Sequence, residues 1–120
     1  MAAPMDDLRD RLARSHELNI TVTGRKSGRA ISIPIWFVLE DDTLYLLPVH
    51  GSDTEWYKNS LKNPSILVKS GSAGAEFGMV PITEAKEVAS VVEKFRQKYG
   101  AGDVKKYYSK LDVAVLAKMQ

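Results

Sequence analysis

An α+β fold, in which helices flank a small and mostly antiparallel β-barrel, is predicted by the order of the segments along this chain. Six segments rich in β-branched and aromatic residues occur as a group of three, then a pair, then a single last one. Only about four segments have the three- and four-residue spacing of an amphipathic helix, so a helix does not alternate with each strand. The 120 residues, 44% hydrophobic and 27% charged, predict one globular domain over residues 1–120.

The first segment, "PMDDLRDRLARSH", predicts a short amphipathic helix within residues 1–16. Met5, Leu8 and Leu12 fall at helical spacing, and a proline and two aspartates at the start of the segment favour a helix start there. Its three arginines are balanced by three aspartates, so we interpret the charged side as solvated, and contact with a membrane is the less favoured alternative.

The next three segments, residues 17–24, 30–40 and 43–49, predict a meander of three strands. In the middle segment, "AISIPIWFVLE", isoleucine, phenylalanine and leucine alternate onto one face from residue 31 to residue 39. Pro34 cannot donate to a strand ladder. This strand is therefore expected at an edge, with a bulge or an opening where a ligand has room to bind.

The rest of the chain predicts three helices and three strands. Ser52 and Glu55 have the spacing of a capping box before a helix over residues 53–62, which buries Trp56 and ends before Pro64. A long helix is expected between Thr83 as its N-cap and Gly100, and a short helical turn from Asp103. The remaining strands are expected at residues 65–69, 75–82 and 111–118.

Composition excludes several kinds of site. The chain has no cysteine, which excludes disulfides and thiolate chemistry, and its two histidines, His16 and His50, have no acidic pair at metal-ligand spacing. No metal site is therefore predicted. The formal net charge of +2 gives no global attraction to nucleic acid. No apolar run is long enough for a membrane span or a signal peptide, so a cytoplasmic protein is expected.

The turn "TGRKSGR", residues 23–29, is the most informative local pattern. Arg25, Lys26 and Arg29 lie among glycines between two predicted strands, an arrangement suited to binding phosphate or carboxylate. The turn does not match a P-loop. Taken alone, these residues fit equally well a hairpin tip that is charged only for solubility.

Two motifs together, "TVTGRKSGRAISIPIWFV" and "HGSDTEWYKNSLKNP", resemble the deazaflavin-dependent nitroreductase family of the flavin/deazaflavin oxidoreductase superfamily. That family has a strand, a basic glycine-containing turn, a strand with proline, and a "WYxNLxxNP" helix. The resemblance covers about residues 18–118. It implies a six-stranded split β-barrel like that of pyridoxamine-phosphate oxidase, which holds a flavin-type cofactor beside the barrel.

By the same resemblance, site residues are expected on four segments. Tyr107 and Tyr108 would cover the substrate side, where a tyrosine hydroxyl can stabilise negative charge on the acceptor. The cofactor-binding set has a basic turn for the phosphate or acidic tail, a strand beneath the ring system, a loop with backbone amides and one aromatic wall: Arg25, Lys26, Arg29, Ser32, Pro34, Pro48, Val49, His50, Gly51, Ser52 and Trp56.

The implied activity is transfer of a hydride from reduced coenzyme F420, a deazaflavin, to a small quinone, nitro or enone acceptor. Such chemistry needs no protein nucleophile or metal, since the cofactor carries the reaction. The alternatives are an FMN-dependent oxidoreductase of the same fold and a non-catalytic carrier of a flavin or tetrapyrrole. A homodimer is expected, because split barrels commonly pair about a two-fold axis.

Overall fold

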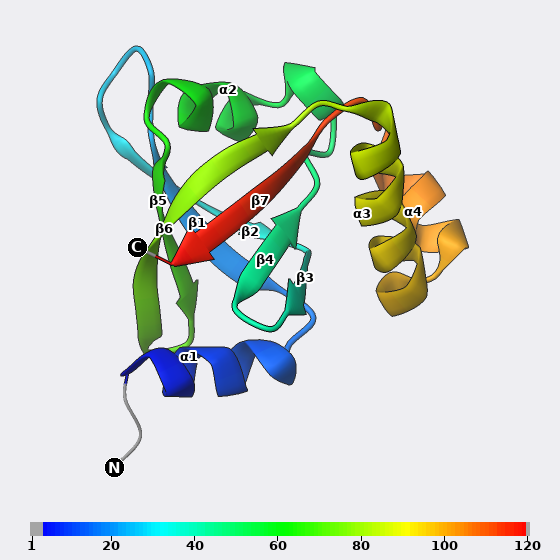
Figure 1. The fold of residues 1–120 in the computed structure, drawn as a ribbon. Coiled ribbons are helices and arrows are strands. Elements are labelled where there is room, and N and C mark those ends of the chain that lie inside the picture. The colour runs from blue at the N-terminus through cyan, green and yellow to red at the C-terminus, as the bar shows by residue number, and fades with distance from the viewer. Residues whose placement is uncertain (1–3, 120) are drawn as a thin grey trace.

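The computed structural model describes residues 4–119, in which seven strands form one sheet surrounded by helices (Figure 1). The helices are α1 (Pro4–Ala13), α2 (Glu55–Lys62), α3 (Ala85–Tyr99) and α4 (Ala101–Tyr107), and the 3-10 helix η1 (Gly51–Asp53) precedes α2. The strands are β1 (Leu18–Thr23), β2 (Ala30–Ile35), β3 (Phe37–Glu40), β4 (Thr43–Leu46), β5 (Ser65–Ser70), β6 (Ala73–Ile82) and β7 (Ala114–Met119).

The strands lie in the order β2-β1-β5-β6-β7-β4-β3, and each neighbouring pair is antiparallel. The sheet curls into a half-barrel, with the last strand, β7, between β6 and β4 (Figure 1). The predicted α+β class with a mostly antiparallel sheet is confirmed. Pro34 lies on β2, which is an edge of the sheet, as its missing N–H requires.

The prediction of a single strand over residues 30–40, and of a three-stranded meander, is wrong. The segment breaks at Trp36, so β2 and β3 lie at opposite edges of the sheet, and the strands number seven instead of six. The backbone of Phe37 bonds on both sides to the hydroxyl of Tyr99, a residue that follows it by 62 positions. This long-range contact has no local signal in the sequence.

Two apolar cores lie on the two faces of the sheet. The first is enclosed by the curled sheet and closed at opposite ends by α1 and α2, which contribute residues such as Leu8, Leu12 and Trp56 (Figure 1). The second packs α3 and α4 against the outer face through Val92, Phe95 and other buried residues. The long helix buries the face that its three- and four-residue spacing predicts.

The helix ends differ in part from the expected caps. Thr54, not Ser52, is the N-cap residue of α2, because Ser52 lies in η1 and bonds to Asp112 instead. Glu84, not Thr83, precedes α3. Gly100 ends α3 with a φ of 95°, which confirms the predicted stop.

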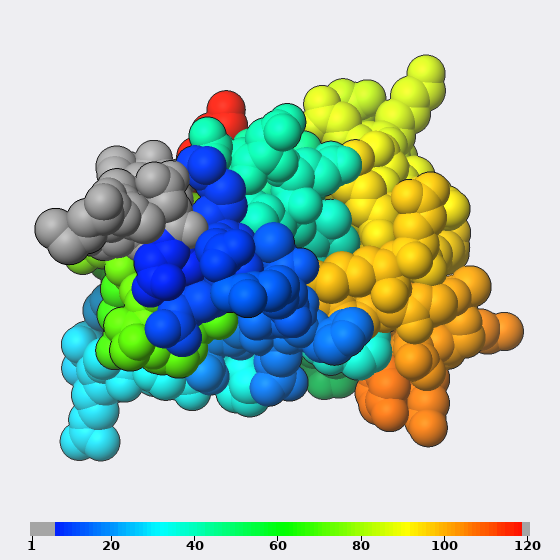
Figure 2. Space-filling view, turned by 90° about the horizontal axis from the view of Figure 1, so that it is seen from below, coloured from blue at the N-terminus to red at the C-terminus, as the bar shows by residue number. Residues whose placement is uncertain are grey.

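The charged side of α1 is held in ion pairs. Arg11 pairs with Asp7 at 3.2 Å, Arg14 pairs with Asp10 at 2.8 Å, and Arg9 pairs with Asp42 across the sheet end. The underside of the molecule, with α1 in dark blue, is seen in Figure 2. Within residues 4–119 no helix has the length and apolar character that a membrane crossing requires.

Lys98 near the end of α3 is expected to make stability depend on pH. Its ammonium donates to the carbonyl of Phe37 at 2.9 Å, and burial lowers the pKa of Lys98 to about 8. An unfolded lysine has a pKa of about 10.4. Between these values the unfolded chain binds a proton that the folded protein has lost, so the contribution of Lys98 to the free energy of unfolding rises with pH.

The measurement is urea denaturation of the wild type and of Lys98→Met at pH 7, 8, 9 and 10. The stability of the wild type relative to this variant should increase from pH 8 to pH 10. Lys105→Met, which changes an exposed lysine on α4, is the control and should give a difference that stays constant over the same range. A constant difference for Lys98→Met would contradict the prediction.

Candidate functional site

A cavity of about 380 Å³ opens where β2 ends, and we call it the aromatic pocket. Its walls come from four separate segments: the residue before β1, the passage from β2 to β3, the loop after β4, and the end of α4. Its volume lies within the range of ordinary small-molecule sites. The lining residues are Glu17, Pro34, Ile35, Trp36, Leu47, Val49, Tyr107 and Tyr108.

Trp36 is the centre of the aromatic wall. Its ring stacks on that of Tyr99 with centroids 4.2 Å apart and planes 5° apart, and Tyr107 meets it edge-on at 5.4 Å. Tyr108 lies 6.1 Å from the same ring. These are favourable aromatic geometries, so the wall is held in one arrangement before any ligand binds.

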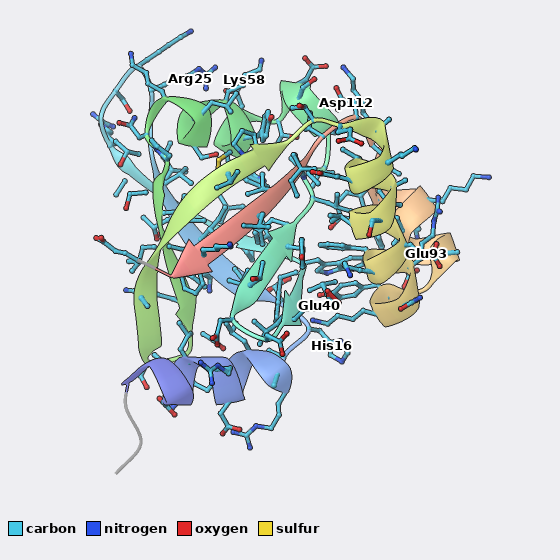
Figure 3. The ribbon with its side chains drawn as sticks, in the orientation of Figure 1. His16, Arg25, Glu40, Lys58, Glu93 and Asp112 are labelled. Carbon is cyan, nitrogen blue, oxygen red and sulfur yellow. The ribbon has the colours of Figure 1, made fainter. Side chains whose placement is uncertain are left out.

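The hydroxyl of Tyr99 fastens the wall to the backbone. It accepts a hydrogen bond from the amide of Phe37 at 3.1 Å, and carbonyl acceptors lie 2.9 Å away at Phe37 and 2.6 Å away at His16. Burial raises the pKa of Tyr99 to about 12, so the hydroxyl stays protonated over the physiological range. His16 is labelled in Figure 3 near the foot of α3.

Tyr107 and Tyr108 both line the pocket but differ in exposure. Tyr107 is 50% exposed and forms a rim, whereas Tyr108 is 7% exposed. Burial raises the pKa of Tyr108 well above its usual range, so its hydroxyl is a neutral donor. Within residues 4–119 that hydroxyl has no hydrogen-bond partner in the protein.

The loop after β4, with Pro48 and Val49 beside the pocket, is held by its own hydrogen bonds. The amide of His50 donates to Thr54 at 2.8 Å, and the amide of Gly51 donates to the carbonyl of Pro48 at 3.1 Å. The amide of Ser52 donates to Asp112 at 2.9 Å. These three amides have protein acceptors already, so in this structure the loop offers the pocket the side chain of Val49 instead.

Asp112 ties that loop to the segment after α4. Its carboxylate accepts from the Ser52 hydroxyl at 2.6 Å as well as from the Ser52 amide, and these bonds hold the pKa of Asp112 below its usual range. His50 contacts Ser109 through Nδ1 at 2.8 Å, and Lys110 pairs with Asp53 at 3.1 Å. Together these contacts fix Val49 relative to Tyr108. Asp112 is labelled at the top of the molecule in Figure 3.

The basic turn at residues 24–29 packs beside α2. Arg25 donates from its backbone amide and its guanidinium to the Asn59 side chain at 3.1 and 2.8 Å, and it pairs with Glu55 at 2.8 Å. Asn59 is 5% exposed and anchors the turn through these bonds. Figure 3 shows Arg25 and Lys58 together above α2.

Lys26 and Arg29 are the available cations of the turn. Both are exposed, and within residues 4–119 neither is in an ion pair. Lys26 and Lys58 both lower the pKa of the Glu55 carboxylate, after the larger effect of its bond with Arg25, so the positive charges of the turn and of α2 lie close together. The turn therefore presents a positive surface to solvent. Arg25 holds this turn on α2 through its bonds to Asn59 and Glu55.

β2 connects the basic turn with the aromatic pocket. Its six residues span about 17 Å, and its first four side chains are exposed or half-buried. Ser32 bonds to the Thr21 hydroxyl at 2.8 Å on this strand, and Pro34 reaches the pocket. In Figure 2 the turn (light blue) and α4 (orange) project from the same side of the molecule, at opposite ends.

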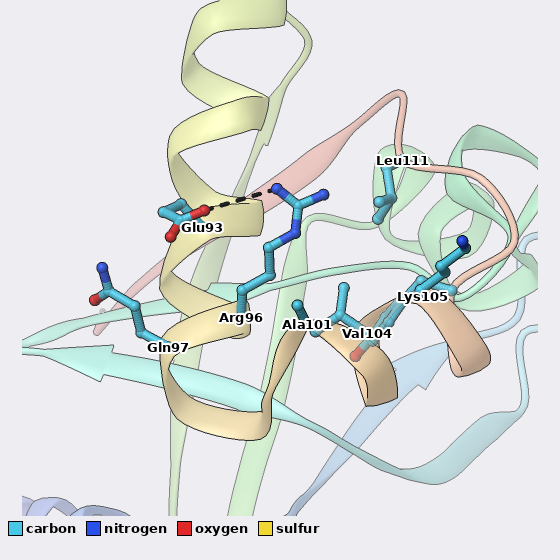
Figure 4. A pocket seen from close by; sticks show the side chains of 8 residues that line it. Glu93, Arg96, Gln97, Ala101, Val104, Lys105 and Leu111 are labelled. Atoms are coloured by element: carbon cyan, nitrogen blue, oxygen red, sulfur yellow. Dashed lines mark ion pairs between the residues drawn. The ribbon is translucent and has the colours of Figure 1, made fainter.

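A second cavity of about 750 Å³ lies between α3 and α4 (Figure 4). Arg96 pairs there with Glu93 at 3.6 Å, and the two side chains approach each other in Figure 4. Tyr108 lines this cavity too and so separates it from the aromatic pocket. None of the other residues expected at the site lines it.

The structure brings together part of the expected set. Pro34, Val49, Tyr107 and Tyr108 meet in the aromatic pocket, whereas Lys26 and Arg29 lie at the far end of β2. Trp56 does not line the pocket: it is 3% exposed in the enclosed core, as the spacing of aromatics on a helix more often indicates. No group of three metal-ligating side chains occurs in the described part of the chain.

Sequence reasoning missed four members of the pocket: the apolar Ile35 and Leu47, and also Glu17 and Trp36. Trp36 is half-buried where the strand segment breaks, and Glu17 is an exposed residue between α1 and β1. Only the proline two positions before Trp36 indicated that this part of the strand is exceptional. Nothing local marks Glu17, which reaches the pocket through the fold.

Solved structures of similar fold bind or act on different molecules. An F420-H2-dependent reductase is 20% identical and covers 86% of this chain and 94% of its own length, with a TM-score of 0.68. A putative pyridoxamine 5′-phosphate oxidase from Listeria innocua is 12% identical, with coverages of 98% and 94% and a TM-score of 0.70. HutZ, the haem storage protein from Vibrio cholerae, is 13% identical, with coverages of 96% and 87% and a TM-score of 0.69.

These likenesses support the α+β fold with a curled antiparallel sheet, which here has seven strands and not the six that the resemblance implied. A domain-swapped dimer is also among the structures with this fold. The comparison with curated proteins gives no match. The model of the DUF2255 family, described as uncharacterized protein conserved in bacteria, matches residues 8–115. Since this match spans nearly the whole chain, the protein belongs to the DUF2255 family.

Proposed function

We propose that this protein binds a flavin-type cofactor along β2 and reduces a small acceptor in the aromatic pocket. The observation that carries the proposal is one exposed edge strand with a basic turn at one end and an apolar aromatic pocket at the other. A deazaflavin or flavin has the matching parts, a planar ring system and an anionic tail. The fold of an F420-H2-dependent reductase supports coenzyme F420 as the first candidate.

The residues present fit such a cofactor. Lys26 and Arg29 would hold the phosphate or acidic tail, because both are exposed and Arg offers a planar fork of donors. Ser32 and Pro34 would lie beneath the ring system, and Val49 would cover its apolar edge. Arg25 is expected to act indirectly, by holding the turn on α2.

A reduced deazaflavin, when bound, supplies a hydride to an acceptor. The protein's part is to position the acceptor and to exclude water, which the aromatic wall does with rings that are already fixed. The protonated hydroxyl of Tyr108 would donate a hydrogen bond to a quinone, nitro or enone oxygen as negative charge develops there. Tyr107, at the rim, would cover the acceptor from the solvent side.

Titration of the purified protein with coenzyme F420 and with FMN, followed by cofactor fluorescence, tests the proposal. Binding of either one supports it and identifies the cofactor, and binding of neither refutes it. Mixing the reduced complex with a soluble quinone then distinguishes two functions. An enzyme consumes the reduced cofactor, whereas a carrier leaves it unchanged.

The basic turn gives a quantitative prediction for that titration. Lys26→Ala is expected to weaken binding by about 1 kcal/mol, or about fivefold, which is the upper range for an exposed charge pair. The double change of Lys26 and Arg29 to alanine should weaken binding about tenfold or more. Lys86→Ala, on α3, is the control and should bind as the wild type does. An unchanged affinity of the double variant would remove the turn from the site.

A haem or flavin carrier is the second candidate, favoured by the same fold in a haem storage protein. The aromatic pocket has no histidine or other usual haem ligand apart from its two tyrosines. A homodimer is proposed on the evidence of a domain-swapped dimer with this fold. Sedimentation equilibrium measures it directly.

A further inference from the structure

We propose that the aromatic pocket selects planar molecules that carry a positive charge and discriminates against anionic ones. The selection of ligands depends only on the residues of the pocket. The extension of this selection to the substrates of a reaction rests on the proposed function.

The first observation is the charge of the lining. Glu17 is the only charged residue among the eight that form the aromatic pocket, and no lysine or arginine lines it. An anionic ligand would therefore lose hydration without gaining a positive partner. A cationic group beside the ring of such a ligand would gain the carboxylate of Glu17.

The second observation is the arrangement of the rings. The faces of indole and phenol rings are negative and attract cations within about 6 Å. The cluster already holds two ammonium groups from outside the pocket: Lys106 lies 5.3 Å from the ring of Tyr107, and Lys98 lies 5.1 Å from the ring of Tyr99. The surroundings of Trp36 thus suit an ammonium group.

The C-terminal end of α4 adds negative charge near the pocket. α4 ends at Tyr107, and Tyr107 and Tyr108 both line the cavity. The C-terminal end of a helix carries partial negative charge on its free carbonyl groups. The end of α3 at Tyr99 adds less, because the positive N-terminal end of α4 begins directly after Gly100.

The positive charges of Lys98 and Lys106 offset the attraction of a cationic ligand only in part. The ammonium of Lys98 donates to the carbonyl of Phe37 and lies 3.6 Å from the centroid of the Phe37 ring. Lys106 lies over the ring of Tyr107 at the rim. Neither lines the cavity. The charge inside the aromatic pocket is that of Glu17.

Three probes with the same nitrobenzyl group but different charge test the selection in the protein without cofactor. They are 4-nitrobenzyltrimethylammonium, neutral 4-nitrobenzyl alcohol and anionic 4-nitrobenzoate, with affinities measured by titration calorimetry and by quenching of tryptophan emission. The cation should bind about three- to tenfold more tightly than the alcohol, and 4-nitrobenzoate should bind most weakly. Trp36→Phe should remove most of the quenching and thereby place the probe at this pocket.

Glu17→Gln should bring the cation to within about twofold of the alcohol. Glu84→Gln is the matched control, since Glu84 precedes α3 and lies about 22 Å along the helix from Tyr99; it should keep the order of the wild type. Equal affinities for the three probes, or a preference that survives Glu17→Gln, would overturn the inference.

The cofactor titration keeps the two proposals apart. Selection of the cation without binding of F420 or FMN would reject the proposed function and leave this inference standing. Binding of a cofactor without selection among the probes would support the proposed function and reject this inference.

Discussion

Replacing Gly51 by alanine is expected to lower the free energy of unfolding by about 2 to 5 kcal/mol. Gly51 has a φ of 55°, where a side chain costs about 1 to 2 kcal/mol. A β-carbon there would lie 2.0 Å from the Asp112 carboxylate and 3.0 Å from the carbonyl of Lys110. The carboxylate must then move and leave the Ser52 amide without its acceptor, a loss of about 1 to 3 kcal/mol.

The measurement is the free energy of unfolding of Gly51→Ala by chemical denaturation, with Gly102→Ala as the control. Gly102 lies within α4, and a β-carbon added there would meet nothing within 4 Å, so alanine should stabilise the helix by about 0.5 to 1 kcal/mol. Gly51→Ala should also weaken binding of a nitrobenzyl probe, since Val49 is fixed by the same contacts. If both variants were as stable as the wild type, the contact of Asp112 with the loop would have no structural importance.

Tyr99→Phe should lower the free energy of unfolding by about 2 to 4 kcal/mol. The change removes one oxygen, which accepts from the buried amide of Phe37 and faces two carbonyl acceptors. An unpaired buried amide costs about 1 to 3 kcal/mol, and loss of the bond that the hydroxyl donates adds about 0.5 to 1.5. Few single hydroxyl groups are expected to have so large an effect.

Tyr107→Phe is the control for this second experiment. Its hydroxyl belongs to a ring that is 50% exposed, so urea denaturation should show a change below about 0.5 kcal/mol. The emission of Trp36 supplies a second measurement, because that ring stacks on Tyr99. A loss of stability for Tyr99→Phe no larger than for Tyr107→Phe would mean that water replaces the hydroxyl.

Local patterns predicted most of the elements. The periodicity of α3, its stop at Gly100 and the antiparallel pair β5 and β6 are set by residues close in sequence, and the structure confirms them. The break at Trp36 was not predictable in this way, because its cause is Tyr99, far along the chain. The strict alternation through residues 31–39 concealed the break, since Ile35 and Phe37 both face the enclosed core.

The candidate site was predictable only where a motif named its residues. Pro34, Val49 and the two tyrosines, which the resemblance named, line one pocket. Arg25 was expected among the ligand contacts, but its charge is engaged by Glu55 and Asn59, a pairing between two segments that spacing does not reveal. Glu17 enters the pocket only because the fold brings the segment before β1 and the end of α4 to the same strand end.

The single residue between β2 and β3 has a consequence for how this chain tolerates changes in length. Ile35 and Phe37 lie in the enclosed core, whereas Trp36 and Val38 pack in the outer one. One inserted residue at this point would turn every side chain of β3 to the opposite face and exchange the two sets.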